Sequence, residues 1–107
     1  MKGRYEQMAD IIKSNLRVKS GTVSSASNHT FTVPSSSTHL FIVVGGDARL
    51  WMGIINAKAN GAVSYAEAAK GTAATASSAT NSFTMTWSSS GQFIWTDICL
   101  SGTPMTA

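Results

Sequence analysis

Two histidines are the side chains of this sequence best suited to acid–base chemistry, with serines and carboxylates available as partners. A hydrolytic triad needs a nucleophile, a histidine base and an acid that orients the imidazole. His29 and His39 could supply the base, and Asp47 and Asp97 the acid. No serine, however, stands in the G-x-S-x-G pattern of a nucleophile elbow. We therefore rank a small hydrolase last and expect no catalytic residue.

The remaining chemistry of the acids and histidines is sparse. Glycoside hydrolysis needs two carboxylates at a fixed separation, but only five acids exist, and Glu6 and Asp10 fall in an N-terminal helical pattern. His29 and His39 have no third ligand beside them, so their spacing predicts no metal site. The sequence also lacks a P-loop and a G-x-G-x-x-G fingerprint, and we expect no cofactor.

Three tryptophans offer a different possibility, because sugars stack on exposed aromatic rings. Trp51, Trp87 and Trp95 each stand in an alternating strand pattern, which favours burial in a core or an interface. Trp51 follows the turn residues 45–47 and is the only candidate for an exposed ligand-binding ring. The alternative function is therefore a monomeric carbohydrate-binding module with Trp51 as its platform.

Charge and composition exclude several classes of protein. The 107 residues fit one domain, and the formal net charge of +3 reflects basic side chains gathered near the N-terminus. The rest of the chain lacks the cations and exposed aromatics that nucleic acids require. Cys99 is the single cysteine, so no intrachain disulfide can form. No apolar stretch is long enough for a signal peptide or a membrane span, and we expect a soluble protein made in the cytosol.

Residues 4–16 carry the one helical pattern of the chain. Tyr5, Met8, Ile12 and Leu16 recur at three- and four-residue spacing, with charged side chains elsewhere around the helix. A helix of about three turns is marginal alone in water, so it must pack on its own domain or on copies of itself. The spacing also fits two heptads of a coiled coil.

Residues 17–107 predict a β-sandwich. Threonine favours strands, while serine, asparagine and glycine favour turns, and all four are abundant here. Alternating patterns between turn signals, including a turn at residues 88–91, indicate seven to eight short strands in a sandwich or small barrel. The expected strands are residues 17–25, 29–33, 39–44, 49–56, 62–66, a short one within 67–81, 82–87 and 92–100.

Three of these strands are apolar on both faces. The segments are residues 40–44, 50–55 and 93–95. A strand in a two-layer sandwich normally shows one apolar and one solvated face. The core of one subunit of this size cannot cover both faces of three strands, so another copy of the chain or the N-terminal helix must cover the second face. We expect a homo-oligomer. The residues predicted at its interface are Tyr5, Met8, Ile12, Phe41, Val43, Phe93 and Trp95.

The layout resembles a known class of viral domain. A short helix precedes the segment SGTVSSASNHTFTVP, which is followed by THLFIVVGG, ARLWMGIIN and a terminal GQFIWTDICLSG. This order is similar to the C-terminal β-sandwich tip domains of bacteriophage and prophage tail fibres and of related tail proteins. The resemblance covers residues 17–102.

The resemblance implies an all-β, jelly-roll-like antiparallel sandwich that forms a homotrimer at the end of a fibre. Residues 1–16 would be an N-terminal helix or stalk end, and residues 17–107 the sandwich domain. The implied function is non-enzymatic: a virion structural module, synthesised in the bacterial host cytoplasm, whose loops contact glycans or proteins of the host surface. We expect neither nucleic-acid binding nor membrane insertion. No binding residue carries over, because such tips vary most where they bind.

Overall fold

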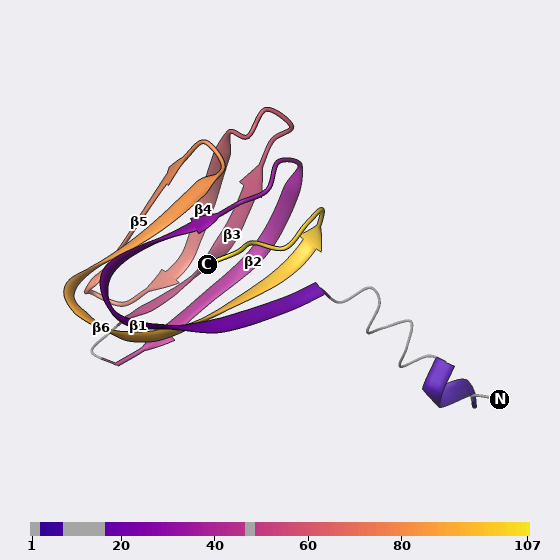
Figure 1. Ribbon diagram of the computed structural model, residues 1–107, viewed down its shortest axis with the longest axis horizontal. Helices are drawn as coiled ribbons and strands as arrows, with labels where there is room; N and C mark the ends of the chain where they lie inside the picture. Colours follow the sequence, from indigo (N-terminus) through magenta and orange to yellow (C-terminus); the bar gives the residue numbers. More distant parts are fainter. Residues whose placement is uncertain (1–2, 8–16, 47–48) are drawn as a thin grey trace.

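The computed structural model describes residues 3–7, 17–46 and 49–107, and nearly all of them form antiparallel β-sheet (Figure 1). The expected all-β class is therefore confirmed. Residues 4–7 are helical and precede the sheet. The strands are β1 (Arg17–Thr32), β2 (Ser37–Gly45), β3 (Leu50–Ala57), β4 (Val63–Lys70), β5 (Ala74–Ala79) and β6 (Ser82–Ser101).

The two long strands, β1 and β6, contribute to both layers of the sandwich (Figure 1). The first part of β1 pairs with the last part of β6, in a sheet of order β1-β6-β2-β3-β4. The second part of β1 pairs with the first part of β6, which also pairs with β5. Side-chain hydrogen bonds join β4 to β5. Tyr65 Oη donates to the Ala76 carbonyl, Ser78 Oγ donates to the Val63 carbonyl, and Lys70 Nζ donates to the Ala74 carbonyl.

A bend in the β1–β6 pair replaces two predicted chain breaks. The register shifts twice between Val23 and Asn28, and Ser25 has a positive φ of 52°. A bulge of this kind curves an antiparallel ladder without ending it. The predicted turn at residues 88–91 is therefore wrong, because β6 continues through it, and the first two predicted strands are one. The described residues form six strands, where seven to eight were predicted.

Aromatic rings fill the space between the two layers. Phe31 and Phe41 meet edge to face with ring centroids 4.9 Å apart, and Phe83 lies 5.0 Å from Trp51. Such tilted and edge-to-face pairs contribute about 0.5–1.5 kcal/mol beyond the burial of area. The core consists of Phe31, Val33, Phe41, Val43, Trp51, Ile55, Ala57, Ala74, Phe83, Met85, Trp87, Phe93, Trp95 and Met105.

Four residues predicted at a subunit interface lie instead in the core of their own subunit. Phe41, Val43, Phe93 and Trp95 are at most 3% exposed. They point inward from β2 and β6, so a partner subunit does not meet their side chains. The structure corrects the prediction because strand alternation defines two faces without showing which one turns inward.

The other predicted interface residues belong to the N-terminal segment. Tyr5 lies in the helical residues 4–7 and is 89% exposed. Met8 and Ile12 lie outside the described residues, so the helix predicted over residues 4–16 stays a prediction beyond its first turn. No helix within the described ranges is long and apolar enough to cross a membrane.

Candidate functional site

The start of β2 and the end of β6 bring a serine, a histidine and an aspartate together. His39 Nδ1 lies 2.9 Å from Asp97 Oδ1 and 3.0 Å from Oδ2, and His39 Nε2 lies 2.7 Å from Ser37 Oγ. The antiparallel register places them, since His39 pairs with Cys99 and Phe41 with Asp97. The order of the three groups is that of a hydrolytic triad. The sequence offers the base and the acid for this role but does not single out Ser37.

Burial and hydrogen bonding give this cluster a structural role. Ser37, His39 and Asp97 are each at most 1% exposed, so the hydroxyl meets no substrate. The Ser37 hydroxyl donates its one hydrogen to the Pro34 carbonyl at 2.5 Å, so this hydrogen is not directed at His39 Nε2, which lies 2.7 Å from the Ser37 oxygen. A nucleophilic serine needs the opposite arrangement, in which the imidazole takes the hydroxyl proton. The cluster is therefore not arranged as a catalytic triad.

The same cluster fastens the C-terminal tail to the sandwich. Asp97 Oδ2 accepts the Met105 backbone N–H at 2.8 Å, and the Met105 side chain is fully buried. Thr106 then forms an antiparallel bridge with Thr32 of β1. A buried carboxylate needs hydrogen-bond donors to offset its desolvation, and here an imidazole and a backbone amide supply them.

His29, the other predicted base, stands elsewhere in the sandwich, opposite Met85 of β6. Its ring packs edge to face on Phe31 with centroids 4.7 Å apart, and burial lowers the pKa of its imidazole. The His29 Nε2 atom has no hydrogen-bond partner among the described residues. No three His, Cys, Asp or Glu side chains of the described ranges gather as a metal site. Asp47, the other predicted acid, lies outside those ranges.

Trp51, the predicted sugar platform, is buried. Only 2% of its surface is exposed, and its Nε1 donates to Glu67 Oε1 at 2.6 Å. The indole lies against Gly53, where an added Cβ would sit 2.4 Å from the ring. The prediction of an exposed Trp51 platform is therefore wrong, because this side chain points inward from β3. Trp87 and Trp95 are buried as well.

The outward-pointing side chains of β2, β3 and β6, with Val18 of β1, form an apolar surface that we name the outer face. They stand in rows across the strands. Val18 opposes Ile98, Ile98 opposes Leu40, and Leu40 opposes Ile54. The aliphatic members of the outer face are Val18, Leu40, Ile42, Val44, Leu50, Met52, Ile54, Ile94, Ile98 and Leu100.

Much of the outer face is open to solvent. Val44 and Ile94 are each 52% exposed and Leu100 is 58% exposed. Monomeric soluble proteins rarely expose contiguous apolar patches larger than a few hundred Å². The strands are thus apolar on both faces, as their sequence indicates. Phe41 and Val43, which were predicted at the interface, point inward. The residues on the exposed face are the neighbours that alternate with them along the strand.

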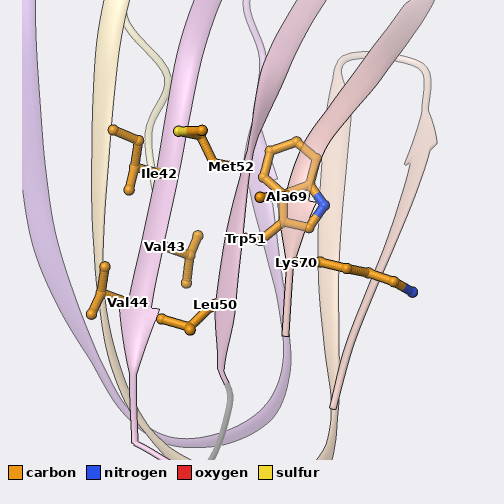
Figure 2. Close-up of a pocket in the computed structure, with 8 residues that line it drawn as sticks. All are labelled: Ile42, Val43, Val44, Leu50, Trp51, Met52, Ala69 and Lys70. Carbon is orange, nitrogen blue, oxygen red and sulfur yellow. The ribbon is translucent and has the colours of Figure 1, made fainter. Parts of the chain in front are cut away.

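A groove of about 260 Å³ lies over the β2–β3 pair (Figure 2). Figure 2 shows Val44 beside β2, Leu50 between β2 and β3, and the Trp51 indole on the opposite side of β3 from Leu50. Lys70 alone among the lining residues is charged, so the groove offers mainly van der Waals contact. The lining residues are Ile42, Val43, Val44, Leu50, Trp51, Met52, Ala69 and Lys70.

Arg49 organises the end of the sandwich opposite the start of β1. Its guanidinium donates to the Gly46 carbonyl at 2.9 Å and to the Ser89 and Ser90 carbonyls at 3.1 and 2.8 Å. It also lies against Gly91, where an added Cβ would fall 2.4 Å from the arginine Cζ. The buried arginine therefore ties the β2–β3 connection to the bend of β6. No sequence motif identifies this role, because all the acceptors except the Ser89 hydroxyl are backbone carbonyls.

Comparisons with known proteins bear on the fold. No protein-family model and no curated protein matches the chain. Among solved structures, the chain is similar to the tailspike protein gp49 of the Acinetobacter baumannii bacteriophage Fri1, described as a capsular polysaccharide depolymerase. The match has a TM-score of 0.50 and 11% sequence identity, and it covers 85% of this chain and 18% of the tailspike chain. The fold is thus related to part of a phage tail protein, and the chain spans less than a fifth of that protein's length.

Proposed function

We propose that the chain is a non-enzymatic structural module of a phage-type tail, a homotrimer in the virion that presents loops to the host surface. The observation that carries this proposal is the likeness of 85% of the chain to a part of a phage tailspike. The tailspike's depolymerase activity is not proposed for this chain, because the match covers only 18% of the tailspike.

The surface chemistry of the described residues supports assembly over catalysis. The cluster with the residue types of a triad, centred on His39, is sealed in the interior. The open groove on β2 and β3 is lined by apolar side chains together with Lys70. A surface of this kind binds another apolar surface and supplies neither an acid nor a base to a reaction.

The loops available for attachment lie at the end of the sandwich away from the start of β1 (Figure 1). This end holds the β2–β3 connection, the β4–β5 turn and the bends of β1 and β6. Backbone hydrogen bonds hold these segments together, from Ser88 N–H to the Ala73 carbonyl at 3.3 Å and from Gly71 N–H to the Leu50 carbonyl at 2.7 Å. A stalk formed by residues 1–16 would leave this end facing the host.

Immunogold labelling tests the place of the chain in the virion. Antibodies raised against the purified protein should label the tails of phage particles produced from the genome that encodes it. Particles whose tails are labelled by an antibody to another tail protein, but not by this one, would contradict the proposal.

Substitutions at the presenting end test attachment. Ser27→Arg and Thr72→Arg replace small exposed side chains at this end with a large cation. We expect each to weaken binding of the purified protein to host cells at least tenfold, a change of about 1.4 kcal/mol. Ala59→Arg, on the exposed β3–β4 loop at the other end, is the matched control and should bind like the parent protein. Equal loss in all three variants, or in the control alone, would place attachment elsewhere.

A further inference from the structure

No helix or strand among the described residues covers the outer face. The apolar side chains on this face indicate what kind of surface binds there. We propose that the outer face packs against further copies of this chain, so that its cross-strand rows form the contacts between subunits. The inference rests on the homotrimer proposed above and assigns its contacts to a surface. That surface differs from the core residues which the sequence pattern had placed at the interface.

The size of the outer face suits a subunit interface. Its half-exposed side chains together leave on the order of 600 Å² of apolar surface open, the upper end for a monomer. A standard interface buries about 800 Å² on each partner. Ser20 and Thr22 at the β1 edge and Ala69 at the β4 edge extend the same rows and supply the remainder.

The absence of charge on the outer face selects an apolar occupant. The middle row runs from Ser20 through Thr96, Ile42 and Met52 to Ala69, and neither this row nor its neighbours contains an ionisable side chain. Asp97, beside these residues in sequence, points into the core. A glycan or a charged peptide would lose water from its polar groups here without gaining hydrogen bonds. A second outer face is mostly aliphatic and brings few such groups to desolvate, chiefly the hydroxyls of Ser20, Thr22 and Thr96.

The position of the outer face in the chain favours copies of the same chain as that occupant. The apolar stripe predicted over residues 4–16 ends two residues before Val18, which begins the first row. Helices that bundle through such stripes in parallel bring their C-terminal ends together around one axis. The first rows of the attached sandwiches then meet around that same axis. A symmetric assembly that buries the predicted stripe would therefore bury the outer face as well.

Charge placed in the outer face tests the interface. Ile54→Lys and Ile94→Lys each put an ammonium group among the rows, and Ser77→Lys, on exposed β5 in the other layer, is the matched control. Native mass spectrometry and sedimentation equilibrium of the full chain should show trimers for the parent protein and for the control. We expect the two isoleucine variants to dissociate, with a dissociation constant raised at least about 30-fold. Circular dichroism and tryptophan fluorescence verify folding of each variant.

A cross-linking measurement reaches the same interface without disrupting it. Ile54→Cys treated with a short bismaleimide should give covalent dimers of the chain, whereas Ser77→Cys should not. Cys99 is buried and present in both variants, so its contribution is the same. If a lysine variant fails to fold, this cross-linking measurement still tests whether the outer face is the subunit interface.

The outcomes separate this inference from the proposed function. Trimers that persist in both folded lysine variants, or no cross-linking through position 54, overturn the outer-face interface and leave the tail module standing. A monomeric parent protein overturns the interface and the trimer, while immunogold labelling still decides the place in the virion. Loss of trimers in the lysine variants alone, together with cross-linking at position 54, supports the interface.

Discussion

At the residue scale, the His39–Asp97 pair shows that side chains typical of catalysis can serve folding. Each member is fully buried, and each polar atom of the pair has a partner: Asp97 accepts from the imidazole and from the Met105 amide, and the imidazole reaches Ser37. The pair therefore connects the loop before β2, the end of β6 and the C-terminal tail. Sequence alone nominates both residues as acid and base. It cannot show that a neighbouring carbonyl takes the serine hydrogen.

Asp97→Asn should lower the free energy of unfolding by about 1–3 kcal/mol, because an amide has one acceptor oxygen in place of two and leaves a buried donor unsatisfied. The amide also offers a poorer acceptor to the Met105 N–H. Urea denaturation followed by tryptophan fluorescence measures the change. Lys19→Gln, an exposed charge on β1, is the control and should stay within about 0.5 kcal/mol of the parent. A loss for Asp97→Asn no larger than that of the control would show that the buried pair does not stabilise the fold.

At the element scale, the sequence predicts the short strands well and the long strands poorly. The strand predicted at residues 39–44 lies within β2, and it pairs antiparallel with β3, which overlaps the strand predicted at residues 49–56. The serine-rich stretch at residues 88–90 suggests a turn, yet β6 continues through it. Pairing with β1 at Thr86 and Gly91, which flank that stretch, and the buried guanidinium of Arg49 hold it extended, and both are contacts from distant parts of the chain. The local sequence pattern carries no information about such long-range contacts.

For a related reason, the sequence does not predict which side chains of β2 point into the core and which point outward. Phe41 and Val43 occupy one face of this strand, while Leu40, Ile42 and Val44 occupy the other. Both sets are apolar, so hydrophobicity does not decide between them. The aromatic partners do, since Phe41 packs against Phe31 from the other layer. The outer face therefore became recognisable only once strand register and burial were known.

Gly91→Ala tests the tie between the β2–β3 connection and the bend of β6. A Cβ at Gly91 would fall 2.4–2.6 Å from the guanidinium atoms of Arg49, so the arginine must move and weaken its bonds to the serine carbonyls. We expect a loss of about 1–3 kcal/mol in the free energy of unfolding. Gly46→Ala is the matched control, because nothing lies within 4 Å of its added Cβ. Equal stability of the two variants would show that the arginine adapts without loss.

At the scale of the whole molecule, the two layers present opposite surfaces to solvent. The layer with β5 exposes hydroxyl groups, as in the pair Thr30 and Thr84, whose Oγ1 atoms lie 2.8 Å apart. The layer with β2 and β3 exposes the aliphatic outer face. A subunit with one polar and one apolar outer surface has a defined inside and outside in an assembly. The hydroxyl layer then faces solvent, while the loops near Arg49 remain free at one end.

Association through an uncharged face predicts how stability responds to concentration and to salt. Unfolding of a subunit whose outer face is buried by its neighbours is coupled to dissociation, so the melting temperature should rise with protein concentration. Raising NaCl from about 0.05 M to about 0.5 M should change the dissociation constant less than about threefold, because screening acts on charges and the rows carry none. Differential scanning calorimetry over a concentration series, repeated at both salt levels, measures both effects. In Ile54→Lys the concentration dependence should disappear, since the monomer unfolds alone. A melting temperature that is independent of concentration in the parent protein would show that unfolding is not coupled to dissociation, which contradicts the outer-face interface. An assembly that salt dissolves would instead place its contacts on charged groups outside the outer face.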